Sequence, residues 1–285
     1  LERLHSHLLW AGLAGHFIGY NTVFMWAWKY REPVLDMFER ISGNRNHYAM
    51  MKIGGVRKDV LKKDIPDFID LLDELTQKND HARLKGVGVL SKKDAIDYAV
   101  LGPTARGSGY DIDVRRDEPY AAYDMLDWDV VVLQEGDVFA KAAVRLLENV
   151  ESIRIIRQCL EKLQELPEGD FFTPVEEFPI GEGIGHAEAP RGEVFHYVRS
   201  DGSNNPIRHK IRAPTFQNLP SFKASCIGET VADVALITAS IDPCYCCTER
   251  MVAVDVDNGQ KLFDGQELIR LSQEKTERMR QKMKG

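Results

Sequence analysis

The stretch Asp137–Leu166, DVFAKAAVRLLENVESIRIIRQCLEKLQEL, decides the fold that we predict for this chain of 285 residues. An apolar stripe at helical spacing runs along its second half, formed by Ile153, Ile156, Leu160 and Leu163. Pro167 follows directly and cannot continue a helix. The stretch therefore predicts one long helix that packs against a core, and with it a mainly helical domain.

Further helices are predicted on both sides of this stretch. Residues 1–41 are predicted to be helical. Pro33 is predicted to begin a new helix after a bend, and the glycine of Ser42-Gly43-Asn44 is predicted to end it. Three more helices are predicted: one from about Pro66, a short one opened by a capping box at Ser91–Asp94, and one over about 229–240.

β-Structure is predicted in one place only. Residues 193–199 and 207–212 flank a polar, glycine-containing turn and predict a hairpin. Residues 101–136 are rich in Gly, Arg, Asp and Pro and are predicted to form a long loop, which in compact domains is commonly functional. The predicted fold class is therefore mainly α (α+β), a helical-bundle core with a small β-hairpin region.

No linker divides most of the chain, and this predicts one domain over residues 1–250. Residues 251–285 form a C-terminal extension with a turn at 255–259 and a highly charged helix. The first residue is Leu1, and the segment is helix-like from its start without a cap. We therefore expect the chain to be a fragment that begins inside a helix.

The segment Leu8–Trp28 contains no Asp, Glu, Lys or Arg and is long enough to suggest a membrane span. Its flanking charges show no one-sided positive bias, and its glycines suit close helix packing. A buried core helix is the favoured interpretation. The histidines of this region are expected to be hydrogen-bonded core residues, namely His5, His7 and His16.

The composition is that of a globular protein, with 44% hydrophobic and 28% charged residues. The net charge of −7 argues against a general nucleic-acid surface. Five cysteines, three of them in one cluster, do not form a secreted disulfide framework, so a reducing compartment is expected.

Of the motifs in the sequence, the cysteine cluster points most directly to a chemical function. Cys244 and Cys247 stand in C-x-x-C spacing behind Asp242-Pro243, and two such thiolates can converge on one soft metal. The other two cysteines outside the cluster, Cys159 and Cys226, lie far apart, so no second pair completes a four-thiolate site. A buried structural pair is the alternative. Structural zinc and a thioredoxin-like redox pair are both disfavoured.

Two other motifs give weaker evidence of function when each is taken alone. In Glu188–Glu193, EAPRGE, the Arg191 guanidinium on a turn could donate to a small anion or to a ligand held at a metal, or the turn could be an ordinary entry into a strand. Gly102–Gly109, GPTARGSG, resembles a phosphate-cradling loop but lacks the Gly-Lys-Ser/Thr ending. Nucleotide binding is therefore disfavoured.

Taken together, several strings extend over nearly the whole chain: LERLHSHLLW (1–10), WKYREPVLDMFERISGNR (28–45), IGGVRKDV (53–60), GPTARGSGYDIDVRRDEPYAAYD (102–124), the helix at 137–166, EAPRGEVFHYV (188–198), KIRAPTFQNL (210–219) and DPCYCCTERM (242–251). Jointly they resemble the large, catalytic subunit of NiFe hydrogenases of the membrane-bound, energy-converting type, which includes the hydrogenase of formate hydrogenlyase. They also look like the quinone-site large subunit of respiratory complex I. That relative has lost the cysteines, so Cys244 and Cys247 favour the hydrogenase.

The resemblance implies a role for individual residues. Cys244 would be a terminal nickel ligand, and Cys247 would bridge nickel and iron. Arg191, with Pro190, would lie over the open face of the metals, near the CO and CN ligands of the iron, and Asp242 would belong to the same outer shell. Soft thiolates suit such metals, and an outer shell tunes them.

The implied chemistry is reversible H2 oxidation and proton reduction, with a terminal thiolate or the Arg191 guanidine taking the proton. Electrons would pass to an iron–sulfur cluster in a separate small subunit and on to ferredoxin, and integral membrane subunits would couple the reaction to ion pumping. The implied location is peripheral, on the cytoplasmic side of the cell membrane.

Three departures from the family pattern matter. The first cysteine pair and a proton-transfer glutamate would lie upstream of the segment that matches Leu1, so half of the metal ligands are absent and the isolated chain is expected to be inactive. Cys246 stands where a small polar residue is more usual, and it could oxidise if exposed. Residues 251–285 extend past the point after Arg250 where a maturation protease often cuts.

Two other functions stay open from the sequence. One is a nickel-free, quinone-linked electron-transfer subunit like that of complex I (NADH-quinone oxidoreductase), which shares the RGSG loop and the helices. The other is a non-catalytic scaffold that docks membrane partners.

Overall fold

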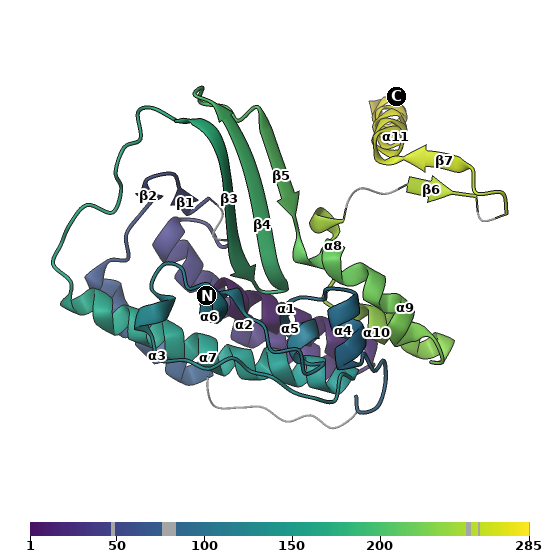
Figure 1. Cartoon of the computed structure of the whole chain (residues 1–285), viewed down its shortest axis with the longest axis horizontal. Helices are drawn as coiled ribbons and strands as arrows, with labels where there is room; N and C mark the ends of the chain where they lie inside the picture. Colours follow the sequence, from purple (N-terminus) through teal and green to yellow (C-terminus); the bar gives the residue numbers. More distant parts are fainter. Residues whose placement is uncertain (47–48, 76–83, 249–251, 256, 285) are drawn as a thin grey trace. The chain divides into compact units, whose positions relative to one another are not determined.

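The computed structural model describes residues 1–46, 49–75, 84–248, 252–255 and 257–284. The chain divides into two compact units, Leu1–Pro243 and Cys244–Gly285. The fold is α+β, with helices dominating the larger unit (Figure 1). The predicted domain division after residue 250 stays a prediction.

Helix α7 (Val138–Glu165) is the long helix predicted from the opening stretch. The carboxylate of Asp137 caps it by accepting a hydrogen bond from the Ala140 N–H at 2.7 Å. Ile153 and Leu160 of the predicted stripe are buried in the main apolar cluster, and Ile156 and Leu163 pack against it. The predicted helix and its core-facing side are therefore confirmed.

Helices α1 (Glu2–Phe17) and α2 (Asn21–Ser42) replace the predicted helix with a bend at Pro33. The chain turns at Gly19, whose φ of +78° favours glycine, whereas Pro33 lies inside α2. The two helices pack closely, because a Cβ on Gly12 would lie only 2.7 Å from Cζ3 of Trp28. The uncharged segment 8–28 therefore comprises the second half of α1, the turn and the start of α2, and several of its large apolar side chains near the turn are exposed, so the favoured single buried core helix is wrong. No helix in the described part of the chain has the length and apolar character to cross a membrane.

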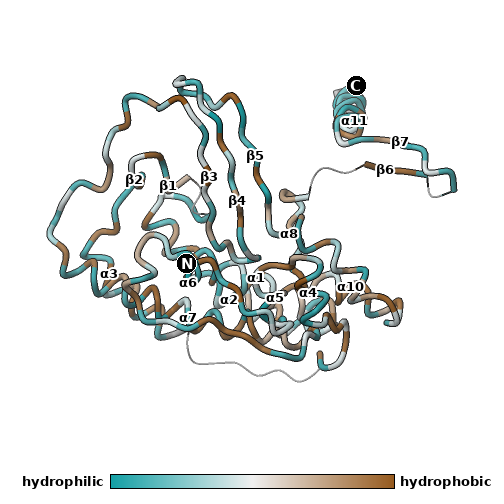
Figure 2. The backbone as a smooth tube through the Cα atoms, viewed as in Figure 1, coloured by the Kyte–Doolittle hydropathy of each residue, from teal (hydrophilic) through white to brown (hydrophobic). Residues whose placement is uncertain are grey.

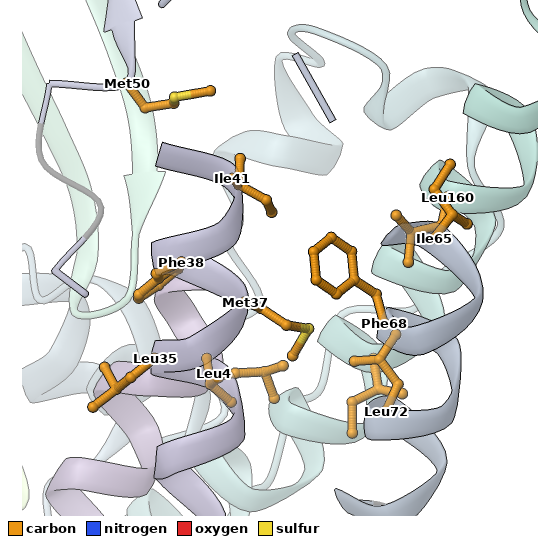
Figure 3. Packing of buried hydrophobic residues seen from close by; sticks show 12 residues of the cluster. Leu4, Leu35, Met37, Phe38, Ile41, Met50, Ile65, Phe68, Leu72 and Leu160 are labelled. Carbon is orange, nitrogen blue, oxygen red and sulfur yellow. The ribbon is translucent and has the colours of Figure 1, made fainter. Parts of the chain in front are cut away.

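The main apolar cluster lies between α2, α7 and α3 (Ile65–Leu75). In Figure 3, Phe68 of α3 and Met37 of α2 point toward each other across the gap between the two helices. Figure 2 shows the hydrophobic residues concentrated along the helices of this unit. Burial of these side chains is the principal stabilising contribution to the helical layer.

The predicted long loop at 101–136 is in part wrong, because it contains short helices. These are α5 (Gly102–Arg106), α6 (Val114–Asp117) and the 3-10 turn η2 (Tyr123–Met125). Pro103 suits the first turn of α5, and the Asp113 side chain caps α6, so local signals for both helices were present. Before them, Ser91 caps α4 (Lys92–Asp97) by accepting from the Asp94 N–H, as the capping box predicted.

A three-stranded antiparallel sheet runs away from the helical layer (Figure 1). Strands β4 (Gly192–Asp201) and β5 (Arg208–Arg212) are the predicted hairpin. The sequence analysis missed β3 (Ile180–Ala189), which pairs with β4 from Ile180↔Asp201 to Ala189↔Gly192. Its alternating glycines have low strand propensity and hide the pattern.

The remaining elements of the larger unit are short. They are β1 (Met51–Lys52), β2 (Gly55–Val56), η1 (Lys62–Asp64), α8 (Pro214–Asn218), η3 (Leu219–Ser221), α9 (Phe222–Cys226) and α10 (Val231–Ser240). Helix α10 matches the helix predicted over about 229–240.

The smaller unit begins at the cysteine cluster with η4 (Tyr245–Cys247). A hairpin of β6 (Val252–Val254) and β7 (Lys261–Asp264), which was not predicted, encloses the predicted turn. Gly259 closes this turn by donating its N–H to the Asp255 carbonyl at 2.8 Å. The predicted charged helix is α11 (Gly265–Lys284).

Candidate functional site

The β3–β4 turn, formed by Pro190 and Arg191, presses against the start of α5. A Cβ on Gly102 would lie 2.4 Å from the Arg191 carbonyl oxygen, and a Cβ on Gly192 would lie 2.7 Å from the Leu101 Cβ. Both glycines also have positive φ, +65° and +129°. Only glycine permits this close backbone approach, which fixes the position of Arg191.

Asn218, at the end of α8, ties the two backbones together. Its Oδ1 accepts a hydrogen bond from the Leu101 N–H at 2.8 Å, and its Nδ2 donates to the carbonyls of Leu101 and Arg191 at 3.3 and 3.5 Å. The Asn218 side chain is buried, so these bonds also satisfy its own polar atoms. Sequence reasoning did not single out Asn218, although it lies within a string that carried the resemblance.

Arg191 reaches Asp242 with one edge of its guanidinium. Its Nε donates to the main-chain carbonyl of Asp242 at 2.8 Å, and its Nη2 donates to Oδ1 at 3.0 Å. Asp242 is 7% exposed, and the guanidinium is partly buried, so this two-point contact is shielded from water. We call these two residues the Arg191–Asp242 pair.

Asp242 adopts a backbone conformation that few non-glycine residues take. Its φ is +57°, directly after the end of α10, and its N–H donates to the Ala239 carbonyl at 2.9 Å. Such residues are uncommon and cost stability unless the surroundings hold them. The strained position turns the carboxylate toward Arg191.

The predicted cysteines open the smaller unit. Cys244 precedes and Cys247 ends the single 3-10 turn η4, and the Cys247 N–H donates to the Cys244 carbonyl at 3.1 Å. Both are partly buried, whereas Cys246 between them is exposed. Within the described ranges, no group of three or more His, Cys, Asp or Glu side chains could hold a metal ion. The structure therefore brings Pro190, Arg191 and Asp242 together, and it places the two cysteines on one turn.

A buried network of charges lies beneath the β3–β4 turn. Glu148 of α7 accepts from Arg3 at 2.9 Å and His7 at 2.8 Å through Oε2, and from the Arg106 Nε at 2.9 Å through Oε1. Arg106 also pairs with two further carboxylates in the same space, at 3.2 Å from Asp113 and 2.9 Å from Glu188. We call these six residues the Glu148 network, with the members Arg3, His7, Arg106, Asp113, Glu148 and Glu188.

Burial and the neighbouring charges of the network determine the protonation states of Glu148 and His7. Burial alone would raise the pKa of Glu148, but Arg106 and Arg3 hold this pKa well below its usual range. Burial lowers the pKa of His7 to about 4 against the opposing effect of Glu148, so His7 is neutral at neutral pH. The expectation of a hydrogen-bonded core residue is confirmed for His7, whereas His5 is only partly buried and His16 is exposed, so the expectation was wrong for His16.

The sequence analysis missed Glu148 and its neighbours on α7. Four polar residues of this helix are almost fully buried and lie on one face: Lys141, Arg145, Glu148 and Ser152. Their spacing of four, three and four residues is helical. A polar stripe on a helix that also carries an apolar stripe was the signal that could have revealed a buried polar site.

The sequence of this chain matches a known family. The family described as the respiratory-chain NADH dehydrogenase 49 Kd subunit matches residues 18–178 and 170–250. The chain is 39% identical to the carbon monoxide-induced hydrogenase of Rhodospirillum rubrum, over 87% of this chain and 72% of that protein. It is also 39% identical to the membrane-bound hydrogenase subunit alpha of Pyrococcus furiosus, over 100% of this chain and 73% of that protein.

Two further matches agree with this family. NADH-quinone oxidoreductase subunit 4 of Thermus thermophilus is 36% identical, over 85% of this chain and 68% of that protein. A chain in the structure of the membrane-bound sulfane sulfur reductase, an archaeal respiratory membrane complex, superposes with a TM-score of 0.75. It is 30% identical, and the match covers 86% of this chain and 74% of that chain. The chain belongs to the 49 Kd subunit family of oxidoreductases.

Proposed function

We propose that this chain is part of the catalytic subunit of a membrane-bound, energy-converting NiFe hydrogenase. The observation that carries the proposal is the C-x-x-C turn of Cys244 and Cys247, which in the sequence is separated from Asp242 of the Arg191–Asp242 pair by Pro243 alone. Within this oxidoreductase family, two hydrogenase relatives at 39% identity agree with it. Two soft thiolates that directly follow Asp242-Pro243 in the sequence suit a redox metal, and the guanidinium that Asp242 holds could act on its ligands and protons.

The donor atoms fit a soft metal centre. Cys244 and Cys247 would hold nickel and iron as thiolates, and further ligands would have to come from elsewhere. The outer oxygen of Asp242, Oδ2, is buried and has no direct hydrogen-bond partner among the described residues. When bound, a nickel–iron centre would supply the site at which dihydrogen is split or formed.

The residues of this chain would manage charge and protons around that site. Asp242 holds one edge of the Arg191 guanidinium, so the remaining Nη1 group is oriented and can donate to a ligand or exchange a proton. A cysteine thiolate is the second candidate for the proton acceptor. The close packing of the β3–β4 turn and the hydrogen bond from Asn218 fix the backbone of Arg191, and this keeps its guanidinium in contact with Asp242.

The proposed partners belong to the hydrogenase proposal, and the membrane-bound complexes among the relatives support the membrane subunits. An iron–sulfur small subunit would carry electrons to ferredoxin, and integral membrane subunits would couple the reaction to ion movement. The chain would lie peripherally on the cytoplasmic side of the membrane.

A second candidate function is nickel-free, quinone-linked electron transfer. It is favoured by the family that matches, the 49 Kd subunit of respiratory-chain NADH dehydrogenase, and by the relative from Thermus thermophilus. The Glu148 network and the Arg191–Asp242 pair serve this function equally well, because neither requires a metal. The two functions differ in whether the cysteines hold nickel.

The deciding experiment is metal analysis of the complex purified without oxygen from its native host. We expect one nickel per chain and infrared bands of iron-bound carbon monoxide and cyanide. H2-dependent reduction of a ferredoxin should accompany them. A complex without nickel and without these bands, but with quinone reductase activity, would replace the first function by the second.

A further inference from the structure

Arg145 is a buried cation that neither function explains. It lies on α7, is 1% exposed, and donates from Nη1 to the Lys141 carbonyl of its own helix at 2.8 Å. Its Nε and Nη2 are buried and have no hydrogen-bond partner within the described ranges of the chain. Nε and Nη2 form one edge of the Arg145 guanidinium. Arg191 uses the equivalent edge of its own guanidinium to hold Asp242. A buried edge of this kind is costly unless an acceptor meets it.

Asp242 supplies the matching acceptor. Its Oδ1 is taken by Arg191, whereas its Oδ2 is buried without a partner among the described residues. Burial lowers the pKa of Arg145 to about 10, and the charge of Asp242 is the strongest of the opposing influences. Arg145 and Asp242 are thus two buried groups of opposite charge, and each has unused hydrogen-bonding capacity.

Trp10 connects the two groups. The Arg145 guanidinium lies over its ring, with 4.5 Å between the guanidinium carbon and the ring centroid. The indole N–H donates at 2.7 Å to the Ala239 carbonyl, the same carbonyl that accepts from the Asp242 N–H. Trp10 therefore contacts both the Arg145 guanidinium and the carbonyl that accepts from the Asp242 N–H, and this places the two residues on either side of one side chain.

No direct ion pair joins Arg145 and Asp242 in the part of the chain that the structure describes. A water molecule has the chemistry to join them, because it can accept from both N–H groups and donate to Oδ2. Buried waters commonly make about three such bonds. An anion does not fit equally well, because the carboxylate would repel it.

We propose that Arg145 is a positioning residue that holds the outer oxygen of Asp242 through ordered water. Asp242 is then fixed by two guanidiniums, directly by Arg191 and indirectly by Arg145, and its strained backbone is maintained. The inference rests on this geometry and applies with or without nickel. Under the proposed hydrogenase function it adds a residue, on a different helix, that keeps Arg191 oriented.

The test is amide hydrogen exchange of the segment 239–243 in the purified complex, with Arg145→Met, Asp242→Asn and the double variant. Loss of a buried, water-mediated hydrogen bond should raise the opening constant of the Asp242 amide by about tenfold in Arg145→Met. In the Asp242→Asn background the same change should have an effect of less than about threefold. Equal effects in the two backgrounds would overturn the proposal.

Two controls separate positioning from loss of packing. Arg154→Met changes a partly buried arginine on the same helix, paired with Asp127, Asp129 and Glu151, and should leave the exchange of 239–243 unchanged. Arg145→Lys keeps the charge without a planar edge and should recover the protection only in part. Full recovery by lysine would show that charge alone suffices and would contradict the role of the edge.

Turnover gives a second readout if the complex is a hydrogenase. Arg145→Met should lower kcat and leave KM for H2 unchanged, since Arg145 does not touch the substrate. If the complex proves not to be a hydrogenase, the exchange experiment still decides this inference. If hydrogenase activity is present but the exchange effects are independent, the inference alone fails.

Discussion

The Glu148 network and the Arg191–Asp242 pair are both buried ionic arrangements in one unit, but they differ in how their polar atoms are used. In the network, both oxygens of Glu148 accept charge-assisted hydrogen bonds from basic side chains. In the pair, Asp242 keeps one oxygen unpartnered among the described residues and has a strained backbone. The comparison indicates that the network would be costly to break, because its buried charges are matched to one another, whereas the pair leaves one oxygen of Asp242 for a further group to use.

The largest effect is expected from breaking the network with Glu148→Gln. The neutral amide would leave Arg3 and Arg106 buried without a full countercharge, and this should cost about 3–5 kcal/mol of unfolding free energy. All four tryptophans lie before residue 244, so fluorescence during denaturant titration reports on the larger unit of the intact chain. Glu161→Gln, an exposed site on the same helix, should change stability by less than about 0.5 kcal/mol. Equal effects at the two sites would contradict the role assigned to the network.

The pH dependence of stability sharpens the same comparison. The pKa of His7 is about 4 in the folded chain against an ordinary 6.5, so the unfolded chain binds more protons between these values. Stability is therefore lost as the pH falls through this window, by about 3 kcal/mol at 1.36 kcal/mol per pKa unit. His7→Gln should remove this contribution, because its amide can donate to Glu148 without titrating. Parallel stability curves for the two proteins between pH 6.5 and 4 would argue against a buried, neutral His7.

A smaller effect is expected where the β3–β4 turn meets α5. Gly102→Ala would place a Cβ 2.4 Å from the Arg191 carbonyl oxygen, in addition to the cost of a φ of +65°. We expect a loss of about 2–3 kcal/mol, and displacement of the Arg191–Asp242 pair. Gly86→Ala is the matched control: its φ is +78°, but no atom lies within 4 Å, so the backbone cost of about 1 kcal/mol should stand alone. Equal losses would show that the close approach is unimportant.

Local sequence patterns predicted much of the fold, but they could not predict contacts between residues that are far apart in the sequence. The apolar stripe predicted α7, and turn residues predicted the β4–β5 hairpin. The turn at Gly19 was missed because the uncharged segment around it has no polar face to mark two helices. Strand β3 was missed because its glycines obscure the alternation, and it acquires strand structure by pairing with β4.

In the candidate site, too, the sequence predicted some residues but not the contacts between them. The motifs identified Arg191, Asp242, Cys244 and Cys247 as chemically significant, and their assigned roles stay predictions. The contact between Arg191 and Asp242 spans 51 residues of sequence, which spacing cannot reveal. Arg145 and Glu148 were visible as polar residues at helical spacing, but only the structure shows that this face is buried.

The central claim is that the Arg191 guanidinium, held by Asp242, acts on the chemistry at a nickel–iron centre. The most direct measurement is the rate of hydrogen–deuterium exchange between H2 and D2O, together with nickel content, for Arg191→Lys in the purified complex. Lysine cannot make the planar two-point contact, so exchange should fall by about 100-fold or more while nickel is retained. Arg199→Lys, at an exposed position of β4, the strand that follows the Arg191 turn, should behave as wild type. An unchanged exchange rate in Arg191→Lys would contradict the account.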